Sequence, residues 1–177
     1  IFRSNDGGAN WKEVFSGFAS VRSIFADSDD TIFMGALRIT YESRDGGNTW
    51  SQIGEFSSTT VSSFVQTQTG DLLAGTTHGV FRSTNGGLSW SFSDAGLPEP
   101  FPRVNTIVQA SNGDLVAGTQ DHGFYRSVDG GVNWAATGTD SPRLQIIEAQ
   151  HSSPDGLFAA TDGGVLHSID NGEIWSY

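Results

Sequence analysis

A motif of eight residues occurs five times in this chain of 177 residues: Ser, any residue, Asp or Asn, any residue, Gly, any two residues, and Trp. The serines of successive copies lie 39, 40, 44 and 41 residues apart, and all 5 tryptophans belong to the motif. One motif in each period of about 40 residues is typical of a stacked or radial repeat. The copies are Ser4, Asp6, Gly8 and Trp11; Ser43, Asp45, Gly47 and Trp50; Ser83, Asn85, Gly87 and Trp90; Ser127, Asp129, Gly131 and Trp134; and Ser168, Asp170, Gly172 and Trp175.

Each full period contains four strand-like runs separated by short turns. After residue 103 the runs are 104–110, 114–119, 123–128 and 133 onward. Four antiparallel strands per period form the blade of a β-propeller, so we expect an all-β propeller. The other periods repeat the pattern at 21–27, 31–36, 39–44 and 49–54; at 61–67, 71–76, 79–84 and 89–93; and at 144–150, 156–161, 164–169 and 174–177.

The motif lies at the turn between the third and fourth strands of a period. Its Asp can accept hydrogen bonds from backbone N–H groups of the turn, and its Gly can supply the positive φ of a tight hairpin. Its Trp can pack a large apolar face beside that turn. Asn85 keeps the acceptor oxygen but not the charge, which a turn tolerates and a catalytic carboxylate does not. We therefore expect a structural role for all five copies.

The motif resembles the Asp-box, or BNR, repeat of sialidases, sortilin-type receptors, xyloglucanases and photosystem assembly factors. The resemblance covers nearly the whole chain. It implies a β-propeller in which the boxes lie on the rim, away from any active centre. It carries little information about activity, because one fold supports many functions.

The repeat divides the chain into about four and a half blades. Residues 1–16 supply only the third and fourth strands of a preceding blade, and complete blades follow at 17–55, 56–93, 94–138 and 139–177. This count predicts an open arc that belongs to a larger propeller or is completed by another chain. We expect both ends to be cuts through a longer polypeptide. An open arc would leave first-strand residues of an end blade, such as Ile24, exposed to solvent.

Composition narrows the possible partners. With 9 basic and 20 acidic residues, the net charge of −11 argues against nucleic acid, because a phosphate backbone would be repelled. The chain has no cysteine, which excludes disulfides, thiol catalysis and Cys-ligated metals. No stretch approaches the length of a membrane span, so we expect no membrane insertion.

Binding residues are expected where the chain departs from its own repeat. These places are the connectors between blades, 17–20, 56–60, 94–103 and 139–143, and the loops between second and third strands. Three prolines stiffen the connector 94–103. It can bind a sugar or peptide, or merely bridge two blades. The ligand-binding candidates are Arg38, His78, Glu99, Phe101, Arg103, Asp121, His122 and Arg143. His78 and His122 occupy equivalent places, which favours a structural role over metal ligation, and no metal site or cofactor is predicted.

Two functions remain open. The first is a non-catalytic scaffold that binds a protein, a glycan or further copies of itself. The repeats of the chain look most like the propellers of large bacterial secreted or cell-surface proteins. This resemblance implies that the protein is secreted or lies on the bacterial cell surface. The second is a fragment of a carbohydrate-active enzyme, in which Glu99, Asp121 or Asp140 would pair at about 5–10 Å. The sialidase Arg-Ile-Pro motif is absent, and Tyr41 and Glu42 lie beside a motif turn, which weakens a sialidase assignment.

Overall fold

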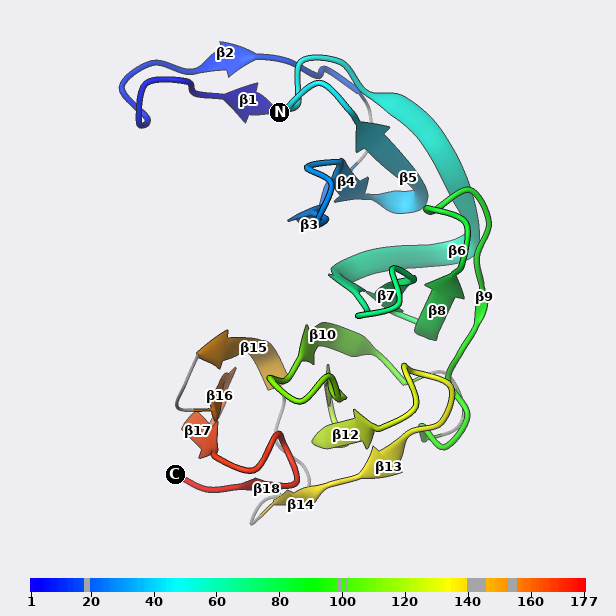
Figure 1. The fold of residues 1–177 in the computed structure, drawn as a ribbon, viewed down its shortest axis with the longest axis vertical. Helices are drawn as coiled ribbons and strands as arrows, with labels where there is room; N and C mark the ends of the chain where they lie inside the picture. The colour runs from blue at the N-terminus through cyan, green and yellow to red at the C-terminus, as the bar shows by residue number, and fades with distance from the viewer. Residues whose placement is uncertain (18–19, 99, 101, 140–145, 153–155) are drawn as a thin grey trace.

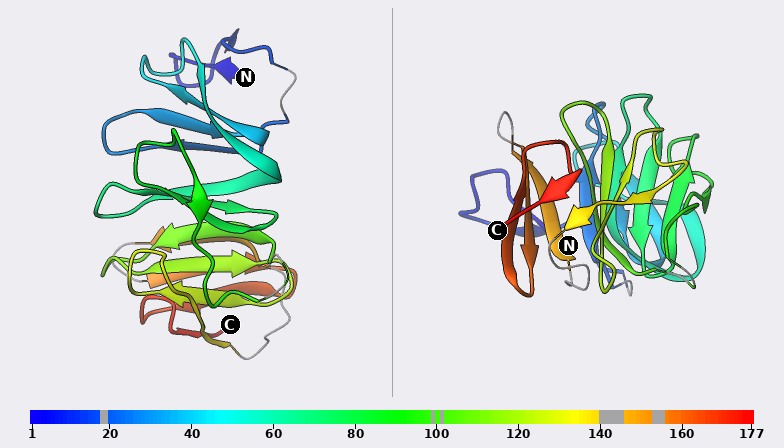
Figure 2. Two further views of the ribbon diagram at one scale, coloured as in Figure 1. Left: turned by 90° about the vertical axis from the view of Figure 1, so that its right-hand side faces the viewer. Right: turned by 90° about the horizontal axis from the view of Figure 1, so that it is seen from below.

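A computed structural model describes residues 1–17, 20–98, 100, 102–139, 146–152 and 156–177, and all regular structure in these ranges is β-strand. Figure 1 shows the sheets arranged in an arc that is open on one side, with the two chain termini near the opening. In Figure 2 the sheets are stacked along the long axis. The all-β propeller expected from the repeat is confirmed. Within the described ranges no helix is long and apolar enough to cross a membrane.

The chain begins with a two-stranded hairpin, and a seven-stranded sheet follows it. The hairpin pairs β1 (Phe2–Arg3) with β2 (Lys12–Glu13). The sheet runs in sequence order through β3 (Ser23–Ala26), β4 (Ile32–Gly35), β5 (Leu37–Ser43), β6 (Ser51–Gln66), β7 (Leu72–Thr76), β8 (Gly79–Ser83) and β9 (Ser91–Phe92). All neighbouring pairs in it are antiparallel.

Strand β6 corrects one expectation. Residues 56–60 were predicted to be a loop between two blades, but they lie within this single strand of 16 residues. The first part of β6 pairs with β5 and the last part pairs with β7, so one strand serves two successive blades. The segment Ser57–Val61 contains no Gly or Pro, and its Thr and Val residues favour extended backbone.

The second half of the chain forms two further blades. A four-stranded sheet contains β10 (Val104–Gln109), β11 (Leu115–Thr119), β12 (Phe124–Ser127) and β13 (Ala135–Ala136). The last blade contains β15 (Ile146–Ser152), β16 (Gly156–Thr161) and β17 (Gly164–Ser168), and a bridge joins His167 to Ser176. Next to that bridge, β18 (Ile174–Trp175) pairs in parallel with β14 (Gly138–Thr139). This pairing ties the connector after one blade to the outer edge of the next.

The core is divided into three clusters, each of which lies between neighbouring blades. One joins Leu73 and Val80 to Leu115 and Trp134, and another joins Val116 and Phe124 to Leu157 and Trp175. A third surrounds Phe33, Phe64 and Phe81. Because a blade with a neighbour on each side buries both faces, β7 and β11 are buried at every position.

The glycine near the end of β7 allows the next blade to approach closely. A Cβ at Gly75 would lie 2.9 Å from Cγ1 of Val104 in the following blade. The next residue, Thr76, donates its hydroxyl to the carbonyl oxygen of Gly79 at 2.9 Å, and Thr119 bonds to Gly123 in the same way at 2.8 Å. Gly75 thus permits the close blade spacing, and Thr76 and Thr119 stabilise the turns that follow their strands.

The end blades expose residues whose counterparts are buried elsewhere. Ile24 on β3 is 61% exposed, whereas the equivalent Phe64 and Ile107 are 7% and 3% exposed. At the other end Val165 is 62% exposed, although its equivalents Val80 and Phe124 are buried. Exposure of the end faces is what an open arc requires.

Candidate binding face

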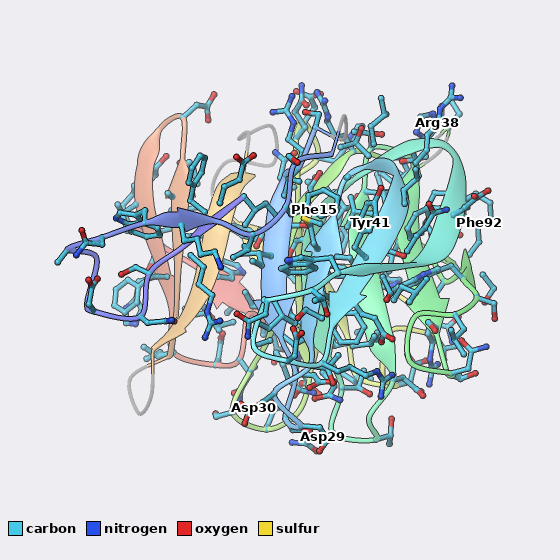
Figure 3. The ribbon with its side chains drawn as sticks, turned by 90° about the horizontal axis from the view of Figure 1, so that it is seen from above. Phe15, Asp29, Asp30, Arg38, Tyr41 and Phe92 are labelled. Atoms are coloured by element: carbon cyan, nitrogen blue, oxygen red, sulfur yellow. The ribbon has the colours of Figure 1, made fainter. Side chains whose placement is uncertain are left out.

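The blades present their turns on two opposite faces. The loop face carries the turns β4–β5, β7–β8, β11–β12 and β16–β17 together with the connector that precedes β10. The motif face carries the β3–β4 turn and the motif turns. Figure 3 shows Arg38 at one end of the first complete blade and Asp29 and Asp30 at the opposite end, with Phe15 and Tyr41 between them.

The five motif turns share one hydrogen-bond pattern. In each, the Ser hydroxyl donates to the side-chain oxygen of the Asp or Asn at 2.7–2.9 Å. The same Ser oxygen accepts the Gly N–H at 2.8–2.9 Å. The Asp or Asn oxygen also accepts the backbone N–H of the residue before Trp at 2.9–3.0 Å. These residues are Asn10, Thr49, Ser89, Asn133 and Ile174. One side-chain oxygen of each Asp or Asn is thereby occupied inside the turn.

These bonds lower the pKa of the motif carboxyls. Hydrogen bonds from the Asn10 side chain and backbone and from Ser4 lower the pKa of Asp6 to about 2. Bonds from the Thr49 backbone and side chain and from Ser43 have the same effect on the pKa of Asp45. Burial raises the pKa of Asp129, but bonds from Asn133 and Ser127 outweigh it and lower the value to about 2. The motif carboxylates are held in the charged form.

The motif tryptophans differ in their surroundings. Trp134 and Trp175 are 4% and 1% exposed, and Trp175 stacks on Phe124 of the preceding blade with ring centroids 4.0 Å apart. Trp11 on the N-terminal hairpin is 62% exposed. Trp50 and Trp90 have intermediate exposure, so the buried motif tryptophans are those of the last two blades.

On the loop face, the connector before β10 is bonded to two blades. The N–H of Gly79 donates to the carbonyl oxygen of Pro102 at 2.8 Å. The N–H of Gln120 donates to the carbonyl oxygen of Arg103 at 2.9 Å, and the Arg103 guanidinium donates to Gln120 Oε1 at 2.7 Å. These bonds place an exposed arginine at the junction of the two blades.

Three further predicted binding residues lie beside this junction. His78 follows Thr77, whose hydroxyl lies 3.1 Å from His78 Nδ1, and directly precedes Gly79. Asp121 and His122 follow Gln120 and are exposed, and the His122 N–H donates to Thr119 Oγ1 at 3.1 Å. We call His78, Arg103, Asp121 and His122 the junction patch.

The other candidates are not part of this patch. Arg38 was expected in a loop between second and third strands, but it lies within β5 of the neighbouring blade. It is exposed, and its φ of 68° coincides with the register shift between Leu37 and Ile39. Glu99, Phe101 and Arg143 lie outside the described residues, as does Asp140. The spacing of the proposed carboxylate pair therefore stays a prediction. Among the described residues, no group of three or more His, Asp or Glu side chains is arranged to hold a metal ion.

Sequence reasoning missed Gln120, which orients Arg103. Charged and aromatic side chains are the usual sequence signals of a binding site, and an amide in a variable loop gives no such signal. It also missed two clefts that lie outside the loop face. One, of about 520 Å³, is lined by residues that include Arg126, Trp134 and Glu173. The other, of about 510 Å³, lies between the N-terminal hairpin and the first complete blade.

The blades, the motif turns and the junction patch together define a β-propeller repeat protein. Residues 1–114 match the family described as the DUF6242 beta propeller domain, and the chain belongs to this family. No curated protein matches the chain.

Solved structures show the same fold at low identity. A GH74 enzyme from Niastella koreensis is 19% identical with a TM-score of 0.80, over 99% of this chain and 33% of the enzyme. YCF48 bound to a D1 peptide is 17% identical with a TM-score of 0.69, over 99% of this chain and 59% of YCF48. A protein of unknown function from Dyadobacter fermentans is 16% identical with a TM-score of 0.65, over 89% of this chain and 68% of that protein. The chain thus spans about a third of the enzyme and less than two thirds of YCF48.

Proposed function

We propose that this propeller is a non-catalytic interaction module that binds a protein partner through its loop face. The observation that carries the proposal is the position of Arg103, which is exposed and bonded to Gln120 at the junction of two blades. A cation fixed in this way loses little conformational freedom on binding. Beside it, Asp121 adds a carboxylate that accepts hydrogen bonds and His122 adds an imidazole ring. The patch can therefore make several polar contacts with a peptide.

A peptide partner agrees with two further observations. YCF48, which shares the fold, has been solved with a D1 peptide bound. The net charge of −11 disfavours nucleic acid, because a phosphate backbone would be repelled. The repeated motif is, in this proposal, an Asp-box that shapes the blade corners and does not contact the partner. We place the protein outside a bacterial cell, because its repeats look like those of secreted bacterial propellers.

A peptide array tests the proposal. The wild-type chain should bind a subset of immobilised peptides, and Arg103→Glu should reduce those signals at least tenfold. Arg44→Glu is the matched control, because Arg44 is an exposed arginine whose charge is paired with Glu42 on the motif side of the blade. Loss of binding in both variants, or in neither, would contradict a role for the junction patch.

A second function is supported by the exposed carboxylate of Asp121 on the loop face. In this alternative the chain is part of a carbohydrate-active enzyme, and Asp121 acts with a second carboxylate. Incubation with xyloglucan and other β-glucan oligosaccharides separates the two functions. Hydrolysis that is lost in Asp121→Asn would favour the enzyme, whereas peptide binding without hydrolysis would favour the interaction module.

A further inference from the structure

Strand β1 has an open edge. In each complete blade the third strand lies between two others: β8 pairs with β7 and β9, and β12 pairs with β11 and β13. Strand β1 occupies the equivalent place in the N-terminal hairpin, since it precedes a motif turn and pairs with β2. Within the described residues β2 is its only partner. An open strand edge of this kind can pair with an added strand.

The space beside this edge is apolar. The 510 Å³ cleft is lined by residues that include Trp11, Ile24, Ile32 and Trp50. Ile24 pairs with Met34 as Phe64 pairs with Ala74 in the next blade, so the two residues are equivalent. Phe64 is buried, whereas Ile24 is 61% exposed. An occupant of the cleft would gain burial against Ile24.

The charge pattern says more about the occupant. Arg82 on β8 pairs with Asp71 at the start of the second strand of its blade, and Arg126 on β12 pairs with Asp114 at the same place. Blades without the arginine also lack the aspartate. In the blade that contains Glu42, Thr31 takes the place of the aspartate, and in the blade that contains His167, Gly156 takes it.

Arg3 on β1 has the same place in its repeat as Arg82 and Arg126. It makes one of the two side-chain contacts that Arg126 makes. Arg126 also reaches the following blade, where its Nη1 lies 3.4 Å from Glu173. Arg3 makes the corresponding contact, because its Nη1 donates at 2.6 Å to Asn48, which has the same place in its motif as Glu173. The second-strand aspartate is the part that an occupant of the open edge would have to provide.

We propose that the open edge of β1 binds a β-hairpin with the pattern of the first and second strands of this repeat, whose second strand begins with Asp and pairs with Arg3. Residues 61–76 and 104–119 show the pattern: Val, two residues, Phe or Ile, Val-Gln, three residues, Gly-Asp-Leu, one residue, Ala-Gly-Thr. A hairpin fits better than a second copy of the chain. Each complete blade of a copy carries its own third and fourth strands, which would compete with β1 and β2 for the same place.

The experiment uses a fluorescent synthetic peptide of residues 104–119 and the 177-residue chain, with anisotropy as the measurement. The peptide should bind saturably. Its Asp114→Asn version and the protein variant Arg3→Gln should each weaken binding about tenfold, since each removes one charge-assisted pair. The charge swap of Arg3→Asp with an Asp114→Arg peptide should recover most of the affinity. Arg44→Gln serves as the control and should bind like the wild type.

Three outcomes would overturn the proposal. The peptide fails to bind although circular dichroism shows a folded chain, or it binds equally with Asp and Asn. In the third outcome, sedimentation shows that the chain alone forms dimers that Arg3→Gln dissociates. That result would mean that a second copy occupies the edge.

Discussion

Trp134 donates its indole N–H to the backbone carbonyl oxygen of Ser93 at 2.8 Å, so the motif of one blade is bonded to the end of the preceding blade. The backbone adds to this link, because the Trp134 N–H donates to Ala95 at 2.8 Å. The Ser93 hydroxyl in turn donates to the carbonyl oxygen of Gly131 at 2.5 Å. The motif therefore both closes its own turn and joins two blades.

We expect Trp134→Ala to destabilise the chain by about 3–5 kcal/mol, because it removes a buried indole and opens a cavity between blades. Trp134→Phe should cost less, about 1–3 kcal/mol, mainly through the lost hydrogen bond. The control is Trp11→Ala, since Trp11 is 62% exposed and should cost about 1 kcal/mol or less. Urea unfolding measures all three. Equal effects at Trp11 and Trp134 would contradict a joining role for Trp134.

The motif glycine Gly131 lies against the preceding blade. Gly131 has a φ of 88°, and a Cβ there would lie 2.2 Å from Cδ2 of the buried Leu73 in the preceding blade. Its neighbour Gly130 has a φ of 72° but faces open space. Gly130→Ala should cost about 1–2 kcal/mol from backbone strain alone. Gly131→Ala should cost about 1–3 kcal/mol more through overpacking, as measured by urea unfolding. The opposite order would show that the blades do not meet at Gly131.

Acid should weaken the motif turns. The pKa of Asp45 is about 2 in the folded chain, below its usual value of 3.8, because Thr49 and Ser43 bond to the charged form. A lowered pKa contributes stability that is complete above the usual value and is lost as the pH falls through about 2. Urea unfolding at pH 5, 3 and 2 should therefore show declining stability. Asp45→Asn should reduce the decline, since Asn85 forms the same turn without a charge.

An NMR titration of the Asp45 carboxyl provides the direct control for this prediction. A midpoint near 2 agrees with the hydrogen bonds of the turn. A midpoint near 4 would show that these bonds do not persist in solution.

Much of the fold could be predicted from the sequence, because the motif and the strand runs repeat at a fixed period. The course of β6 could not, since residues 56–60 lack turn residues and look the same in a strand or an extended connector. Exposure of Trp11 and burial of Trp175 could not be distinguished either, because the two motifs match and only their neighbours differ. At the loop face the variable turns indicated His78, Arg103, Asp121 and His122. Their proximity depends on how the connector before β10 folds back on two turns, which spacing alone does not show.

The exposed face of the last blade should bind apolar molecules. Phe158 is 39% exposed and stacks on His167, whereas the equivalent Leu73 is fully buried beneath the next blade. The double variant Phe158→Ser, Val165→Ser should lower the binding of a hydrophobic dye and change stability by about 1 kcal/mol. Leu73→Ser should instead cost several kcal/mol, about as much as other buried large-to-small changes. Dye binding that is unchanged in the double variant would place the apolar surface elsewhere.

The central claim is that motif residues stabilise the blades and that junction-patch residues bind the partner. The most direct test compares Asp129→Asn with Arg103→Glu on the same peptide array and in the same unfolding experiment. Asp129→Asn should keep the peptide signals and change the pH dependence of stability, whereas Arg103→Glu should lose the signals at least tenfold and keep its stability. Loss of peptide binding in Asp129→Asn with full binding in Arg103→Glu would contradict the claim.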